Sequence, residues 1–158
     1  MKLYKREGKR FVETINPVDR IGMYVDNSGL FFTKDKTQSS IGKCVMIEDG
    51  HYVIACIEDH YEKLTAREAL RYKWRVYTCY DAFIPSIELL FYTTHKYPEL
   101  FNKQKQYMSS NSFGDQHSGY SGVHYLLFAS GYQYWNYGYA GYGSCLSIKL
   151  FYKIPITS

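Results

Sequence analysis

The sequence of 158 residues lacks the features that mark membrane and secreted proteins. It has no apolar run close to the roughly 18 residues that a membrane-spanning helix needs. Its first residues, MKLYKREGKRF, contain no apolar stretch like that of a secretory signal peptide. We therefore expect no membrane insertion, and a location in the cytoplasm or on a virion. The length predicts one domain, with or without a short appendage, that can bury a core.

Cysteine is scarce and widely spaced, at Cys44, Cys56, Cys79 and Cys145. No C-x-x-C pair is present, so the sequence does not indicate a zinc site. Cys44, Cys56 and Cys145 fall within apolar or alternating runs, which predicts small buried thiols in a reducing compartment. A single disulfide is the alternative.

Positive charge is modest, and it is absent from most of the C-terminal third. The net charge is +4, and the one basic cluster lies in MKLYKREGKR. We interpret this cluster as a solvated tail, with a phosphate-binding arm as the alternative. No Lys or Arg occurs between residues 106 and 148, which removes the phosphate contacts that dominate nucleic-acid binding. We expect no nucleic-acid partner.

Patterns that indicate catalysis are weak. His117 and His124 are seven residues apart and, with Asp115, suggest a metal or acid–base group, but no third ligand has a useful spacing. Cys79 and Asp81 lack an identifiable base. The run GYAGYG neither follows a clear strand nor opens a helix, as a nucleotide-binding loop does. We therefore expect a non-enzymatic protein without a cofactor or metal.

The first half of the chain predicts two β-hairpins. RIGMYVDNSGLFFT reads as two short strands joined by residues 27–29, where Gly29 suits a positive φ. GKCVMIEDGHYVIACIED reads as a second hairpin, because Asp49-Gly50 is the signature of a type I′ turn.

Helical signals occupy the middle of the chain. Thr65 and Glu68 fit a capping box and predict a short helix over residues 65–73. Ser86 is the expected N-cap of a second helix, which Pro98 ends while opening a further turn.

The last third has no helical period. VHYLLF and SCLSIKLFYKI read as strands, and in the second of these alternate residues from Leu146 to Ile154 form the expected core face. SSNSFGDQHSGYSG and GYQYWNYGYAGYG are rich in Gly, Ser and Asn and predict loops or short irregular strands. The order of strands, two helices and strands predicts an α+β fold with small twisted antiparallel sheets and a long loop-rich C-terminal region.

Several segments resemble a known family in the same order. WRVYTCYDAFIPSIELLFYTTHKYPELFN, YMSSN, VHYLLFASG and SIKLFYKIP resemble the corresponding segments of bacterial and phage C-type-lectin-fold domains, over roughly residues 40–155. Within that group the chain looks most like the variable proteins of diversity-generating retroelements. The resemblance implies that adenine-directed mutagenesis rewrites a C-terminal cassette whose side chains bind ligand. Before this region we expect an N-terminal arm or hairpin over residues 1–36, either separate or part of the fold. Residues 37–158 would then form the lectin-like domain, with a variable face over about residues 107–143.

The glycine-flanked aromatic cluster in this cassette is typical of a contact surface. A tyrosine offers a large contact area with only two torsions to freeze, and glycine and serine let such side chains reach a partner. Packing of these tyrosines on each other is the alternative. The predicted ligand-binding set comprises Asp115, Gln116, His117, Tyr120, His124, Tyr132, Tyr134, Trp135, Asn136, Tyr137, Tyr139 and Tyr142.

The framework expected to hold this face is made of other, apolar residues. These are Trp74, Ile87, Leu90, Phe91, Leu127, Leu146, Ile148 and Leu150. We expect a receptor- or surface-recognition protein that binds a protein or a glycan. The alternative is a structural module in which the same aromatics form the subunit interface of a homo-oligomer.

Sugar-binding C-type lectins hold calcium with an E-P-N-like triplet and a W-N-D motif. Only Trp135-Asn136 remains of these here, and Tyr137 replaces the acid. Since calcium needs six to eight oxygen ligands, the sequence predicts no calcium site. Stacking of a sugar on Trp135 needs no metal and is the alternative.

Overall fold

A computed structural model describes residues 3–7, 10–14, 16–33, 35–60, 66–76, 80–113, 122–129, 132–139 and 146–157. Strands come first, two helices occupy the middle of the chain, and strands close it. Most strand pairs are antiparallel. The α+β class predicted from the element order is confirmed.

The helices are short and the strands are numerous. Within the described residues, the two α-helices are α1 (Ala66–Arg71) and α2 (Ile87–Lys96), and the two 3-10 helices are η1 (Pro17–Arg20) and η2 (Pro98–Leu100). The strands of the first half are β1 (Leu3–Glu7), β2 (Arg10–Thr14), β3 (Tyr24–Asp26), β4 (Phe31–Phe32), β5 (Ser40–Glu48) and β6 (His51–Cys56). Those of the second half are β7 (Arg75–Val76), β8 (Tyr80–Phe83), β9 (Gln106–Phe113), β10 (Gly122–Ala129), β11 (Tyr132–Tyr139), β12 (Leu146–Ser147) and β13 (Phe151–Pro155).

A large sheet of seven strands has the order β4-β3-β5-β6-β13-β8-β7. Both predicted hairpins, β3–β4 and β5–β6, belong to it. Asp49 and Gly50 have φ values of 49° and 71°, and Gly29 has a φ of 79°, so both turns use the positive φ that their residues favour. The last strand, β13, returns to lie between β6 and β8.

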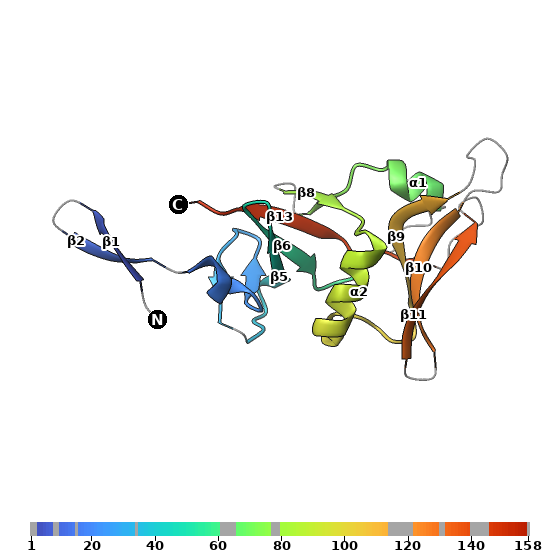
Figure 1. Ribbon diagram of the computed structural model, residues 1–158, viewed down its shortest axis with the longest axis horizontal. Coiled ribbons are helices and arrows are strands. Elements are labelled where there is room, and N and C mark those ends of the chain that lie inside the picture. The colour runs from blue at the N-terminus through green and yellow to red at the C-terminus, as the bar shows by residue number, and fades with distance from the viewer. Residues whose placement is uncertain are drawn as a thin grey trace.

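A small sheet of four strands has the order β11-β10-β9-β12. Helix α2 lies between the two sheets, as Figure 1 shows. The small sheet therefore stands on the far side of α2 from the large sheet.

The final strand-like run is divided between the two sheets. We expected one continuous strand from Leu146 to Ile154, and this is wrong: β12 pairs with β9 in the small sheet, and β13 pairs with β6 and β8 in the large one. The crossover between them is buried, including Lys149. Because this segment has protein on all sides, its alternating pattern does not mark a strand with one solvated face.

The core has two clusters, on opposite sides of the large sheet. Ile54 belongs to the cluster that contains Trp74 and Met108. The adjacent residues Val53 and Ala55 belong to the cluster that α2 covers. Because neighbouring residues of β6 contribute to different clusters, both faces of this strand are buried.

The predicted framework is confirmed where its side chains are described. Trp74, Leu90, Ile148 and Leu150 are buried. Ile87 and Phe91 are half-buried and pack against the second cluster. The side chains of Leu127 and Leu146 are outside the described part.

Helix α2 begins at the predicted cap. The Ser86 hydroxyl accepts a hydrogen bond from the Leu89 amide at 3.1 Å. The side chain of Asn111, on β9, accepts from the Ile87 amide at 2.7 Å. The start of α2 is thus also tied to the small sheet, which the sequence did not predict. Thr65, the predicted cap of α1, lies outside the described residues.

Part of the region 1–36 belongs to the main fold, which is one of the two alternatives that the sequence left open. Strands β3 and β4 lie within the predicted arm, yet β3 pairs with β5 in the large sheet. Only β1 and β2 form a sheet of their own, and Figure 1 shows this hairpin projecting at the end of the molecule opposite the small sheet. The separate N-terminal element is therefore the β1–β2 hairpin alone.

Two expectations about composition can be compared with the described residues. Cys44 and Cys56 are buried free thiols, as predicted, whereas Cys79 and Cys145 fall outside the described part. Among the helices that the structure describes, none combines the length and apolar character needed to cross a membrane.

Candidate functional site

The aromatic cassette forms a regular strand. We expected loops or short irregular strands there, but β11 pairs with β10 along its whole length, from Tyr132 opposite Ala129 to Tyr139 opposite Gly122. Tyrosine and tryptophan favour strands, and this preference outweighs the glycines, of which only Gly138 lies within β11. Residues 132–139 therefore form a strand where a loop or short irregular strands were predicted.

The register divides the predicted ligand-binding set between two faces. Residues opposite one another in an antiparallel pair share a face, and successive residues alternate between faces. Four of the set occupy positions on one face: His124, Trp135, Tyr137 and Tyr139. Three occupy positions on the other: Tyr132, Tyr134 and Asn136. The single face expected from the sequence is thus two rows of positions, and the first row is longer.

The rest of the predicted set lies outside the described residues: Asp115, Gln116, His117, Tyr120 and Tyr142. The predicted start of the face at residue 107 is wrong, because Tyr107, Met108 and Ser109 are buried. The first part of β9 lies between the two core clusters, which receive Met108 and Tyr107 respectively. It is framework rather than contact surface.

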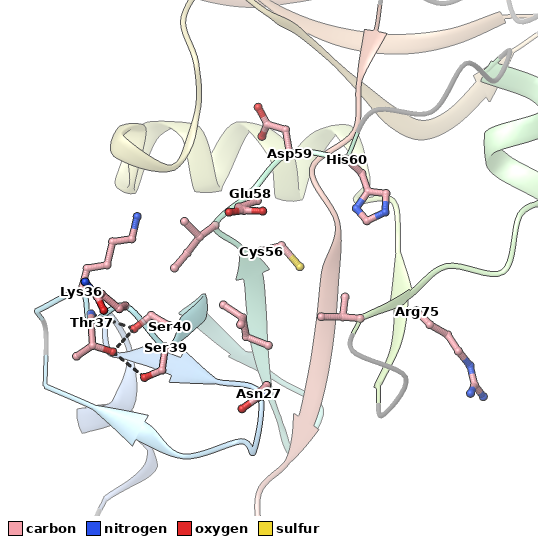
Figure 2. Close-up of a pocket in the computed structure, with 14 residues that line it drawn as sticks. Asn27, Lys36, Thr37, Ser39, Ser40, Cys56, Glu58, Asp59, His60 and Arg75 are labelled. Atoms are coloured by element: carbon pink, nitrogen blue, oxygen red, sulfur yellow. Dashed lines mark hydrogen bonds between the residues drawn. The ribbon is translucent and has the colours of Figure 1, made fainter.

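A cleft of about 930 Å³ opens elsewhere, beside the large sheet. Figure 2 shows its lining, which comes from the loop before β5, the end of β6 and strand β7. The loop contributes the hydroxyls of Thr37, Ser39 and Ser40. Thr37 Oγ1 lies 3.2 Å from Ser39 Oγ and 2.9 Å from Ser40 Oγ. This cleft could not be predicted from the sequence, because its lining residues come from segments that are distant in the chain.

The charged groups of the cleft do not converge on one point. In Figure 2 the carboxylate of Asp59 and the guanidinium of Arg75 are turned away from the hydroxyl-bearing loop, and Arg75 Nε lies 3.5 Å from Asp81 Oδ1. Burial raises the pKa of the Cys56 thiol to about 12, so this thiol stays protonated at neutral pH and is a poor nucleophile. The cleft is therefore a weaker candidate site than the aromatic strand.

The carboxylate of Asp59, a residue of the cleft, contacts side chains from segments that belong to or adjoin both sheets. Asp59 Oδ1 lies 2.8 Å from the fully buried Nζ of Lys149. The Tyr107 hydroxyl donates to Asp59 Oδ2 at 2.8 Å, and Lys105 Nζ lies 3.2 Å from the same oxygen. Lys149 Nζ also donates to the Ile57 carbonyl at 2.9 Å. We call Asp59, Lys149, Tyr107 and Lys105 the junction cluster.

The charges of the junction cluster depend on one another. Burial raises the pKa of the Asp59 carboxyl, but Lys149, Tyr107 and Lys105 together outweigh this effect and hold that pKa below its usual value. Burial lowers the pKa of Lys149, and Asp59 only partly restores it. Burial also raises the pKa of the Tyr107 phenol, so Tyr107 stays protonated and can donate to the carboxylate.

Sequence reasoning missed this cluster because Asp59 and Lys149 are far apart in the chain. One signal was present: a lysine in the middle of the otherwise apolar run LSIKLFY. Lysine is almost never fully buried without a partner, so a lysine that the fold buries requires a nearby carboxylate. Within the described ranges, no group of three or more His, Cys, Asp or Glu residues is placed to hold a metal ion.

Comparisons with known proteins give no relative for this chain. No protein-family model, no curated protein and no solved structure matches it.

Proposed function

We propose that this chain is a non-enzymatic recognition protein with a C-type-lectin-like fold, and that the β10–β11 hairpin forms its ligand-binding surface. The observation that supports the proposal is the placement of five aromatic residues on one strand, β11, at the edge of the small sheet. As far as the side chains are described, both core clusters draw on the large sheet, the helices, β9 and the buried crossover. Strand β11 is separated from β9, which carries the core residues Tyr107 and Met108, by β10.

The arrangement of the elements is compatible with the lectin-like fold that the resemblance implies. In chain order, α1 lies between β6 and β7 of the large sheet, and α2 lies between β8 of the large sheet and β9 of the small sheet. The closing strand β13 then returns to β6, which precedes both helices. The small sheet is therefore joined to the rest of the fold through β9 and β12, and β11 lies at its other edge.

The chemistry of the strand favours a protein or glycan ligand. Tyrosine and tryptophan supply large, rigid contact areas with polar tips. Strand β11 carries no charged residue, so it offers no cation for phosphate. If the strand is diversified by a retroelement, the neighbouring DNA should hold a near-copy of the 3′ end of the gene, differing mainly at adenines, beside a reverse transcriptase.

Tryptophan fluorescence tests whether the aromatic strand is accessible. The chain has two tryptophans, and Trp74 is buried with its indole N–H donating to the Ala69 carbonyl at 2.9 Å. We expect acrylamide to quench Trp135 several-fold more strongly than Trp74, because a contact residue lies in solvent in the free protein. The Trp135→Phe variant reports Trp74 alone, and its difference from the wild type gives Trp135.

The same variant supplies the control for folding. Trp135→Phe should unfold in urea within about 0.5 kcal/mol of the wild type, as surface substitutions usually do. Protected, blue-shifted emission from Trp135 in a monomer would contradict the proposal.

A structural module that assembles through subunit contacts is the second candidate. The β1–β2 hairpin forms a sheet of its own, and a two-stranded hairpin alone is only marginally stable in water, which favours a role in docking. We expect light scattering to find a monomer both in the full chain and after deletion of residues 1–14. This deletion keeps β3 and β4 in the large sheet, whereas removal of residues 1–36 would take them away. A full-length oligomer that dissociates on deletion would favour the assembly function.

A further inference from the structure

The junction cluster connects the two sheets at a single carboxylate. Asp59 follows β6 of the large sheet, and Tyr107 belongs to β9 of the small sheet. Lys149 lies in the crossover between β12 and β13, which belong to different sheets. Two segments that are distant from Asp59 in the sequence thus contact its two carboxylate oxygens.

Lys149 fixes the position of the Asp59 carboxylate relative to the large sheet. The Ile57 carbonyl, two residues before Asp59, accepts from the same Lys149 ammonium that lies 2.8 Å from Asp59 Oδ1. Lys149 Nζ is also 5.3 Å from the centre of the Phe101 ring. Because Lys149 is fully buried, this side chain has few alternative positions, and it holds the carboxylate in place.

Tyr107 links the Asp59 carboxylate to the small sheet. It is fully buried, and its hydroxyl accepts from the Asn102 amide at 2.8 Å while it donates to Asp59. Tyr107 is opposite Leu126 on β10, and Leu126 is opposite Trp135 on β11. Tyr107, Leu126 and Trp135 therefore form one lateral row across the sheet, and this row ends near the middle of the aromatic strand.

We propose that Asp59 is a positioning residue for the recognition hairpin: through Tyr107 it sets where the row from Tyr107 to Trp135 lies relative to the large sheet. The inference rests on the proposed function for its consequence, which is the placement of the ligand-binding strand. Apolar packing also holds the sheets together at the junction. Met108 belongs to the first cluster, and the ring centres of Tyr107 and Phe101 are 5.1 Å apart in an edge contact. Burial of apolar surface has no strong directional preference. The hydrogen bond from Tyr107 to Asp59 is directional and charge-assisted, so it can fix one arrangement.

The test is hydrogen exchange in the full chain with Tyr107→Phe. This change keeps the buried ring and removes only the hydroxyl that reaches Asp59. The change also removes the acceptor of the Asn102 backbone amide, but Asn102 is an exposed residue, so water can accept from that amide instead. We expect amides of β9, β10 and β11 to exchange roughly tenfold faster or more, the effect of losing one hydrogen bond to a charged group, while amides of β5 and β6 change less than about twofold.

Tyr152→Phe is the matched control. Tyr152 is also fully buried, and its hydroxyl has no hydrogen-bond partner among the described residues. Removing that hydroxyl should leave exchange unchanged in both sheets. A role of Asp59 in stability alone would raise exchange equally in the two sheets of the Tyr107→Phe variant. That result, or exchange in β10 and β11 no faster than in Tyr152→Phe, would overturn the proposal.

Failure of this inference is distinguishable from failure of the proposed function. Exchange reports how firmly the small sheet is held, and it does not depend on whether Trp135 is accessible. Quenching of Trp135 in the wild-type protein reports accessibility, and it does not depend on Tyr107. A protein with a quenchable Trp135 and unchanged exchange in Tyr107→Phe would keep the recognition surface and lose the positioning role of Asp59.

Discussion

Replacing Asp59 by asparagine should lower the free energy of unfolding by about 3–5 kcal/mol, the usual effect of removing one partner of a buried ion pair. The change leaves the ammonium of Lys149 buried without its counter-charge, since Lys149 is fully buried and lies 2.8 Å from Asp59 Oδ1. Urea unfolding followed by circular dichroism at pH 7 measures the loss. Lys149→Met should lower the free energy of unfolding by less, because the Asp59 carboxylate keeps its contacts with Tyr107 and Lys105 and is partly exposed to solvent.

The double variant Asp59→Asn/Lys149→Met is the control for this prediction. It removes both charges, so it should be more stable than Asp59→Asn alone, as expected for two residues whose interaction energy is not additive. Equal stability of the double variant and Asp59→Asn would show that the pair is not coupled.

Acid should reduce the difference between the wild type and Asp59→Asn. The pKa of Asp59 is lower in the folded protein than its ordinary value of about 3.9. Its contribution to stability is therefore complete above that ordinary value, and it is lost as the pH falls through the folded pKa. We expect the difference to be constant from about pH 7 to 5 and to shrink below about pH 4. A difference that persists in full at the lowest pH at which both proteins fold would contradict this assignment.

Replacing Leu90 by alanine should lower the free energy of unfolding by about 2–5 kcal/mol. Leu90 lies on α2, is fully buried, and packs in the second core cluster with residues of β5, β6 and β13. The substitution removes apolar contacts and leaves a cavity under the helix that separates the two sheets. Urea unfolding monitored by fluorescence and by circular dichroism measures the loss.

Tyr92→Ala is the control on the same helix. Tyr92 is exposed, with 39% of its surface accessible, so its replacement should change stability by no more than about 0.5 kcal/mol. Comparable losses for the two variants would contradict the assignment of the Leu90 effect to burial, because alanine favours the helix at both positions.

Turns and helix starts could be predicted because their signals are local. Asp49-Gly50 and Gly29 adopt the positive φ values that their residue types favour, and Ser86 caps α2 as expected. These features depend on a few adjacent residues and on backbone sterics, so the surrounding fold changes them little.

The alternating pattern near the C-terminus wrongly predicted one continuous strand, because alternation indicates which residues are buried and not which strands they pair with. Leu146 to Ile154 has a strand-like pattern, but its middle crosses between the sheets, and Lys149 is buried there. The partner that makes its burial possible, Asp59, is set by the fold and not by spacing in the chain. For the aromatic cassette the error was the reverse. Its glycines indicated a loop, but its residues 132–139 form a strand that pairs with β10.

The sequence alone determined the class of the fold, its hairpin turns, the start of α2 and the aromatic character of the C-terminal cassette, because each follows from neighbouring residues or from composition. Only the tertiary structure decided that the cassette is an edge strand with two rows of positions, that Tyr107 and Met108 are core, and that Asp59 meets Lys149 and Tyr107. Strand register, crossovers and buried ion pairs depend on contacts between segments that are distant in the sequence. They are therefore set by how the whole chain packs and not by neighbouring residues.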